Sequence, residues 1–166
     1  LTITVILYYA VPKSRIYIIS LANIIFYGAS GLGFLALFGS IVIITYFCAL
    51  KMNTKRGRLF FFLGLAINVL NLSFFKYTGF ILSNIERFFN VHFIWQDALL
   101  AKIILPVGIS FYTFQLIAYL VDVYKKEIEP CRSLLEFWVF IAFFAQLVAG
   151  PIMRGNNFLP QIKNIK

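Results

Sequence analysis

The sequence predicts an all-α membrane protein, a polytopic transmembrane helix bundle of about six spans. Of its 166 residues, 61% are hydrophobic, 19% are aromatic and only 13% are charged, whereas about 25% of the residues in a soluble domain are charged. The mean hydropathy is +0.89, and uncharged runs of membrane-crossing length recur along the chain. These observations argue against a water-soluble domain and indicate a multi-pass protein in a lipid bilayer.

The spans follow from where the apolar runs are interrupted. Arg15 and Lys51 enclose 35 uncharged residues, enough for two crossings, and the glycine cluster at 28–33 predicts a tight turn between them. Ser133 and Glu136 form a capping box, which predicts a clean start for the last helix. The predicted spans are 1–11, 16–28, 33–50, 59–82, 101–123 and 134–153, with an amphipathic interfacial segment at 84–98. Together they make a single partial membrane domain.

Most basic residues lie in three loops, which predicts the orientation of the bundle. These loops are centred on 13–15, 51–58 and 125–132, and two predicted crossings separate each from the next. All three therefore fall on one side, which the positive-inside rule assigns to the cytoplasm, with the start of the chain outside. The net charge of +9 is thus accounted for largely by basic loops on the cytoplasmic side of the membrane. Without a basic helix or an aromatic-basic motif we expect no nucleic-acid partner.

A polar stripe marks the fifth predicted span. Tyr112, Gln115, Tyr119 and Asp122 recur at spacings of three, four and three. At about 100° per residue they fall within roughly 80° on one helix face. Since polar groups in hydrocarbon are costly, the stripe faces protein or a wet cavity. For Tyr119 and Asp122 the cytoplasmic end of the helix explains the polarity equally well, whereas for Tyr112 and Gln115 both bundle packing and a polar tunnel remain open.

Other polar residues recur at helical spacing in the fourth and sixth spans. Gln146, Gly150 and Arg154 repeat every four residues, and Arg154 is either an interfacial anchor or a ligand for an anionic group. Asn68 and Asn71 are expected to form hydrogen bonds across helices, as polar residues do in membrane bundles.

The chain offers no complete catalytic or metal-binding set. Its single histidine, His92, lies in the predicted interfacial segment, away from the buried polar residues. The two cysteines, Cys48 and Cys131, show neither a disulfide framework nor metal-ligand spacing. We therefore expect no metal, no bound cofactor and no catalytic residue in this chain.

Two long motifs resemble the membrane-bound O-acyltransferase (MBOAT) family. Residues 106–115 (PVGISFYTFQ), continued by 119–124 (YLVDVY), carry the first, and 143–154 (FFAQLVAGPIMR), continued by 158–161 (FLPQ), carry the second. A weaker match lies at 74–77 (FFKY). The chain is most similar to the branch of alginate O-acetyltransferases and D-alanyl teichoic acid transferases, which implies a partial MBOAT fold.

The resemblance places this chain as the N-terminal half of a longer protein, without its first residues. The near-invariant histidine of the family lies in a later apolar segment, and His92 does not match it, so no catalytic residue is carried over. The resemblance implies a tunnel through the membrane. The candidates for the tunnel or substrate path are Ser110, Tyr112, Gln115, Tyr119, Asp122, Gln146 and Arg154.

The implied activity is O-acyl transfer in the bacterial cytoplasmic (inner) membrane. A thioester or acyl carrier on the cytoplasmic side would donate the acyl group, expected to be acetyl. Hydroxyls of an exported or cell-envelope polysaccharide would accept it, directly or through a periplasmic or extracellular acyl-acceptor protein. D-alanyl transfer to teichoic acid is the alternative within the family. A transporter or channel subunit is the alternative outside it, although the chain contains no inverted repeat that would favour transport.

Overall fold

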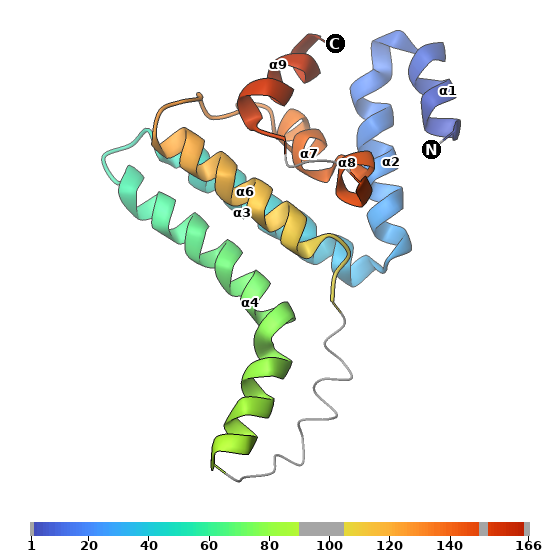
Figure 1. Ribbon diagram of the computed structural model, residues 1–166. Coiled ribbons are helices and arrows are strands. Elements are labelled where there is room, and N and C mark those ends of the chain that lie inside the picture. Colours follow the sequence, from blue (N-terminus) through green and yellow to red (C-terminus); the bar gives the residue numbers. More distant parts are fainter. Residues whose placement is uncertain (1, 90–104, 150–152, 165–166) are drawn as a thin grey trace.

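The computed structural model describes residues 2–89, 105–149 and 153–164, and this part of the chain forms helices joined by turns and loops, with no strand (Figure 1). The predicted all-α class is therefore confirmed for the described residues. The helices are α1 (Thr2–Ala10), α2 (Arg15–Ala29), α3 (Leu32–Lys51), α4 (Gly57–Phe89), α6 (Ile109–Tyr124), α7 (Leu134–Ala142), α8 (Phe144–Ala149) and α9 (Gly155–Asn164), with a 3-10 turn at Pro12–Ser14.

Length and composition qualify two of the described helices, α3 and α4, as membrane spans. A third candidate is the pair formed by α1 and the segment Pro12–Ala29, which meet at a bend of 115°. The nine residues of α1 rise about 14 Å, roughly half the thickness of the hydrocarbon core. The apolar helices α6 and α7 are also shorter than a full span. The count of about six spans is therefore not confirmed by helix length.

The centre of the bundle is formed by α3 and α6, which run side by side (Figure 1). The first half of α4 packs against both, while its second half extends away from the other helices (Figure 1). On the opposite side, α2 packs against α3 and α7. The largest side chains at the centre of this core come from α3, α6 and α7 and are Phe38, Tyr112, Leu116, Tyr119, Phe137 and Phe140.

Two glycines in the left-handed backbone region set helix ends. Gly31 has φ 124° and lies between α2 and α3, and Gly108 has φ 69° and immediately precedes α6. Glycine adopts such angles without the steric cost that other residues incur. The predicted tight turn at 28–33 is thus present, and α6 begins at Ile109, several residues after the predicted start at 101.

Helix α4 approaches its neighbours closely at Gly64. A Cβ atom at this position would lie 3.0 Å from Cδ1 of Leu120 in α6 and 3.3 Å from Cβ of Cys48 in α3. Helices in membranes commonly use small residues in this way, because van der Waals packing drives their association.

Replacing Gly64 with valine is therefore expected to lower the free energy of unfolding by about 1–3 kcal/mol, the usual cost of overpacking. The branched side chain has to displace Leu120 and Cys48. Thermal unfolding of the full-length protein in detergent measures the effect. Gly39→Val in α3 is the matched control, since a Cβ at Gly39 meets nothing within 4 Å. Equal unfolding temperatures for the two variants would contradict the close contact at Gly64.

Both asparagines of α4 form the predicted hydrogen bonds across helices. Asn68 Nδ2 donates to Thr45 Oγ1 of α3 at 2.9 Å and to the Gly64 carbonyl at 2.8 Å. Asn71 Nδ2 donates to the hydroxyl of Tyr112 in α6 at 3.3 Å. The prediction for these two residues is confirmed, and α4 is joined to α3 and α6 by polar as well as apolar contacts.

The segment predicted as the sixth span differs most from expectation. The helix is interrupted at Phe143, which separates α7 from α8. The backbone N–H of Cys131, just before α7, donates to the Tyr119 hydroxyl at 2.8 Å. After α8, a Cβ at Gly155 would lie 3.4 Å from Cδ2 of the same tyrosine. The stretch between Cys131 and Gly155 therefore leaves Tyr119 and returns to it as a broken hairpin, instead of one crossing helix over 134–153.

The end of α4 also differs from the predicted bounds. The helix continues to Phe89, past the predicted end at 82, because no glycine or proline interrupts residues 80–89. The rest of the predicted interfacial segment at 84–98, including His92, lies outside the described residues, as does Gly150.

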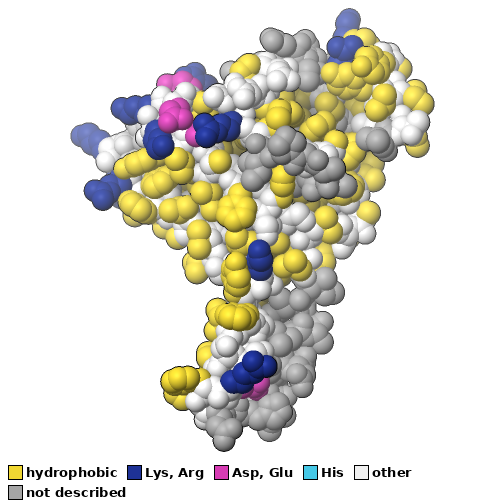
Figure 2. Space-filling model, in the orientation of Figure 1, with side chains coloured by type: hydrophobic (Ala, Val, Ile, Leu, Met, Phe, Trp, Pro, Cys, Tyr) yellow, Lys and Arg dark blue, Asp and Glu magenta, His cyan; other side chains and the backbone are white. Residues whose placement is uncertain are grey.

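Two of the basic loops lie at the same end of the bundle, as the parity argument predicts. Figure 2 shows charged side chains gathered over the adjoining ends of α3, α4 and α6. A cavity of about 410 Å³ is lined by residues 52–54 of one loop and by Lys126 and Glu129 of the other. The loops are therefore neighbours in space.

Candidate functional site

The polar stripe of α6 faces the protein interior. The exposed fractions of Tyr112, Gln115, Tyr119 and Asp122 are 0%, 1%, 1% and 8%. The neighbouring candidate Ser110 is half-buried. Since α6 packs against α3, α4 and α7, the stripe meets protein, which is one of the two environments that its polarity requires.

Tyr112 belongs to an aromatic cluster centred on Phe38. The Phe38 ring centroid lies 4.3 Å from that of Tyr27, 4.7 Å from that of Tyr112 and 5.2 Å from that of Trp138. The Tyr112 hydroxyl accepts the hydrogen bond from Asn71, while the Tyr27 hydroxyl and Trp138 Nε1 are buried without a hydrogen-bond partner among the described residues. Polar atoms are therefore concentrated where α2, α3, α6 and α7 meet.

Gln115 lies beside the break between α7 and α8. In an uninterrupted helix the N–H of Phe144 would donate to the carbonyl of Phe140, four residues earlier. Here Gln115 Nε2 donates to the Phe140 carbonyl at 3.0 Å, and the Phe144 N–H donates to Asn23 Oδ1 of α2 at 3.2 Å. Two side-chain amides thus replace one main-chain hydrogen bond, which permits irregular backbone inside an apolar bundle.

Tyr119 and Asp122 lie nearer the loop end of α6. The Tyr119 hydroxyl accepts from the Cys131 N–H, and its ring centroid lies 4.8 Å from that of Phe137 in α7. Gly155, the residue after Arg154, lies against the Tyr119 ring, since a Cβ atom there would be 3.4 Å from Cδ2. The chain next to Arg154 is therefore close to the stripe, although 31 residues of sequence lie between Asp122 and Arg154.

Gln146 and Arg154 do not share one environment. Gln146 is buried in α8, with an exposed fraction of 6%, whereas Arg154 is exposed and precedes α9. The four-residue spacing that suggested a common helix face therefore does not describe one helix here.

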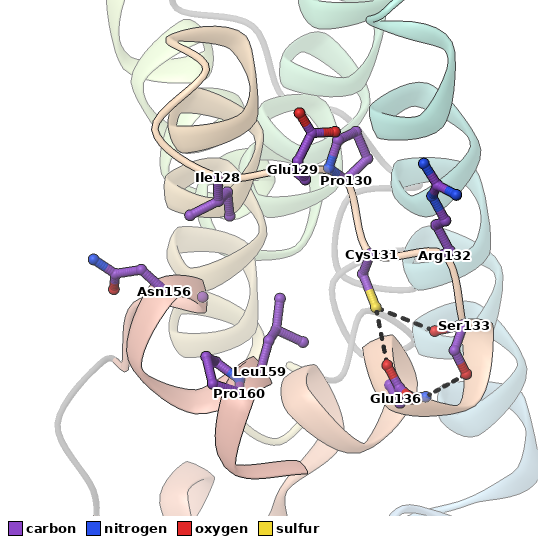
Figure 3. Close-up of a pocket in the computed structure, with 11 residues that line it drawn as sticks. Ile128, Glu129, Pro130, Cys131, Arg132, Ser133, Glu136, Asn156, Leu159 and Pro160 are labelled. Atoms are coloured by element: carbon purple, nitrogen blue, oxygen red, sulfur yellow. Dashed lines mark hydrogen bonds between the residues drawn. The ribbon is translucent and has the colours of Figure 1, made fainter. Parts of the chain in front are cut away.

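The cavity drawn in Figure 3 lies between the loop before α7, the first turn of α7 and α9, with a volume of about 590 Å³. Cys131 Sγ donates to the Ser133 carbonyl at 3.4 Å and to Glu136 Oε2 at 3.9 Å. The Ser133 hydroxyl accepts from the Glu136 N–H at 3.4 Å, so the predicted serine cap of this helix is confirmed. The other polar residues of the lining are Glu129, Arg132 and Asn156.

This cavity was not predicted from the sequence. Ser133 and Glu136 were recognised only as a helix cap, and nothing in the pattern related the loop before α7 to α9. Asn23 was also missed, although a lone amide in the apolar run 16–28 was a signal that it needs a partner. Within the described ranges, no group of three or more His, Cys, Asp and Glu residues is placed to hold a metal ion.

Curated relatives match nearly the whole chain. The probable alginate O-acetylase AlgI of Pseudomonas putida is 32% identical over 162 residues, which are 95% of this chain and 33% of that protein. The corresponding protein of Pseudomonas aeruginosa is 30% identical, with 95% and 31% covered. A peptidoglycan O-acetyltransferase of Helicobacter pylori is 35% identical over 172 residues, covering 87% of this chain and 32% of its own length. The chain belongs to the membrane-bound O-acyltransferase family.

The membrane-bound O-acyltransferase relatives are much longer than this chain. The chain spans about a third of their length, less than the half that the resemblance implied. No family model matches the chain, and no solved structure matches it. Membership of this family rests on the curated relatives, and the arrangement of the described helices comes from the structure alone.

Proposed function

We propose that this chain is part of an integral-membrane O-acyltransferase that transfers acetyl groups to hydroxyls of an exported or cell-envelope polysaccharide. The observation that carries the proposal is the similarity over nearly the whole chain to proteins named for O-acetylation of alginate and of peptidoglycan. A helical, strongly apolar chain with two helices of spanning length supports a membrane location.

We further propose that the complete protein is a multi-pass protein of the bacterial cytoplasmic membrane. In this arrangement the six apolar segments predicted from the sequence lie in the bilayer, some of them as short or broken helices. The paired basic loops at 51–58 and 125–132 face the cytoplasm under the positive-inside rule, and their position at one end of the bundle supports this orientation.

In the proposed reaction an acceptor hydroxyl attacks the carbonyl carbon of a cytoplasmic acyl thioester. An ester bond forms, the thiolate of the donor leaves, and a general base takes the hydroxyl proton. We assign no catalytic residue to this chain. The α6 stripe is proposed to support the wall of the substrate passage, since its residues pack against α3, α4 and α7. The lining of the cavity in Figure 3 includes residues 128–132 of one basic loop, where a donor from the cytoplasm would arrive.

Other activities have less support. D-alanyl transfer to teichoic acid has related chemistry, but the matched relatives are named for O-acetylation. A transporter or channel subunit would also place polar residues inside a bundle, yet those names do not point to transport.

Deleting the gene that contains this sequence is expected to remove ester-linked acetate from the envelope or exported polysaccharide. Mild base releases such acetate, which chromatography then quantifies, and the wild-type gene on a plasmid should restore it. Ester-linked D-alanine, measured in the same hydrolysates, should not change. Loss of D-alanine with unchanged acetate would establish the alternative acyl group, and unchanged levels of both would refute the proposed function.

A further inference from the structure

The break between α7 and α8 is bordered by two buried amides from different helices. Asn23 in α2 has an exposed fraction of 0% and Gln115 in α6 one of 1%. Gln115 donates to the Phe140 carbonyl, and Asn23 accepts from the Phe144 N–H. Because these backbone groups are the donor and acceptor of one helical hydrogen bond, the two side chains act on the same broken turn.

If the two amides served only to stabilise the fold, this arrangement would be unfavourable. Asn23 Nδ2 and Gln115 Oε1, the other halves of the two amides, are buried without a hydrogen-bond partner among the described residues. A buried polar atom without a partner destabilises a protein, and an unbroken helix with apolar side chains at both positions would avoid this. Departures of this kind from local stability are expected mainly at functional sites.

The break also shapes what lies around it. Phe143, at the interruption, and Phe144, the first residue of α8, help to line an apolar cavity of about 440 Å³ between α1, α2, α7 and α9. Beyond the break the chain turns back to Tyr119, so that Gly155, the first residue of α9, lies beside this side chain of α6, while α9 packs against α7. If residues 134–149 formed one continuous helix, residues 144–149 would extend along the axis of α7 and would not occupy their present position beside the break.

We propose that Asn23 and Gln115 are a pair of positioning residues that hold the α7–α8 break, and that acyl transfer depends on this break. The proposal rests on the acyltransferase function proposed above. It assigns a role to Asn23 that the sequence did not suggest, and it gives Gln115 a structural target, the Phe140 carbonyl, in place of direct contact with substrate.

A double-mutant cycle on the full-length protein tests the pair. Asn23→Leu leaves the Phe144 N–H without its acceptor, and Gln115→Leu leaves the Phe140 carbonyl without its donor, so each single variant should unfold at a lower temperature in detergent. In the double variant the two orphaned groups can bond to each other as in a regular helix. We expect the double variant to lose clearly less stability than the sum of the singles, while its acyl-transfer rate stays at least about tenfold below wild type.

Asn68→Leu combined with Gln115→Leu is the matched control. Asn68 is equally buried and hydrogen-bonded, but its partners are Thr45 and Gly64, so these two effects should add. If the single variants do not accumulate in the membrane, the proposal expects that the Asn23→Leu/Gln115→Leu double variant still does.

Two results would overturn the proposal. Additive destabilisation by Asn23→Leu and Gln115→Leu would show that the amides do not act on one break. Wild-type acyl transfer by a double variant with restored stability would show that the reaction does not need the break. If the wild-type protein itself lacks acetyl transfer, the proposed function fails, whereas the stability cycle still decides whether the two amides hold the break.

Discussion

Replacing Phe38 with alanine is expected to lower the free energy of unfolding by about 3–5 kcal/mol, as for other large buried aromatic side chains. The Phe38 side chain is 1% exposed, and its ring contacts Tyr27, Tyr112 and Trp138. Removing the ring leaves a cavity where α2, α3, α6 and α7 meet, and the surrounding helices can close it only in part. Unfolding of the full-length protein in detergent, followed by circular dichroism, measures the loss.

Phe47→Ala provides the control on the same helix. The Phe47 side chain is 51% exposed and faces away from the core, so its removal should cost about 0.5 kcal/mol or less, as for other surface positions. Similar losses for Phe38→Ala and Phe47→Ala would mean that the aromatic cluster is not the centre of the bundle.

Replacing Tyr119 with alanine is expected to have an effect of similar size, about 3–5 kcal/mol. The Tyr119 ring packs against Phe137, and its hydroxyl accepts the hydrogen bond from the Cys131 N–H. Both ends of the α7–α8 hairpin contact this side chain, because Gly155 lies against the same ring. The substitution should therefore also reduce acyl transfer by the full-length protein, measured as base-released acetate on the polysaccharide.

A conservative variant separates the ring from the hydroxyl. Tyr119→Phe keeps the packing and removes only the acceptor for the buried Cys131 N–H, which should cost about 1–3 kcal/mol. Tyr124→Phe, at the exposed end of α6, is the control and should leave the unfolding temperature unchanged. If Tyr119→Phe and Tyr124→Phe unfold alike, the hydroxyl does not hold the start of the hairpin.

The fold class and several local features were predictable from the sequence. Low charge content and long apolar runs predicted a helical membrane protein, because the bilayer requires internally satisfied backbone groups. The glycines at 28–33 predicted the α2–α3 turn, and Ser133 predicted the start of α7. The spacing of Tyr112, Gln115, Tyr119 and Asp122 predicted one face of a helix, and all four side chains are buried.

The broken hairpin was not predictable from periodicity. Residues 134–149 are apolar apart from Glu136 and Gln146 and contain no proline or glycine, so nothing near Phe143 in the sequence marks an interruption. The break depends on two amides that lie far away in the sequence, Asn23 and Gln115. Likewise, the cavity of Figure 3 brings α9 against the loop before α7, a contact that depends on the path of the chain through the break.

The return of the chain to Tyr119 has a consequence for reading hydropathy plots. A plot of this sequence counts one membrane crossing at 134–153, whereas Cys131 and Gly155 both contact the same tyrosine of α6. One apolar peak thus corresponds to two short helices separated by a break at Phe143. The number of such peaks in a hydropathy plot is therefore not the number of full-length helices.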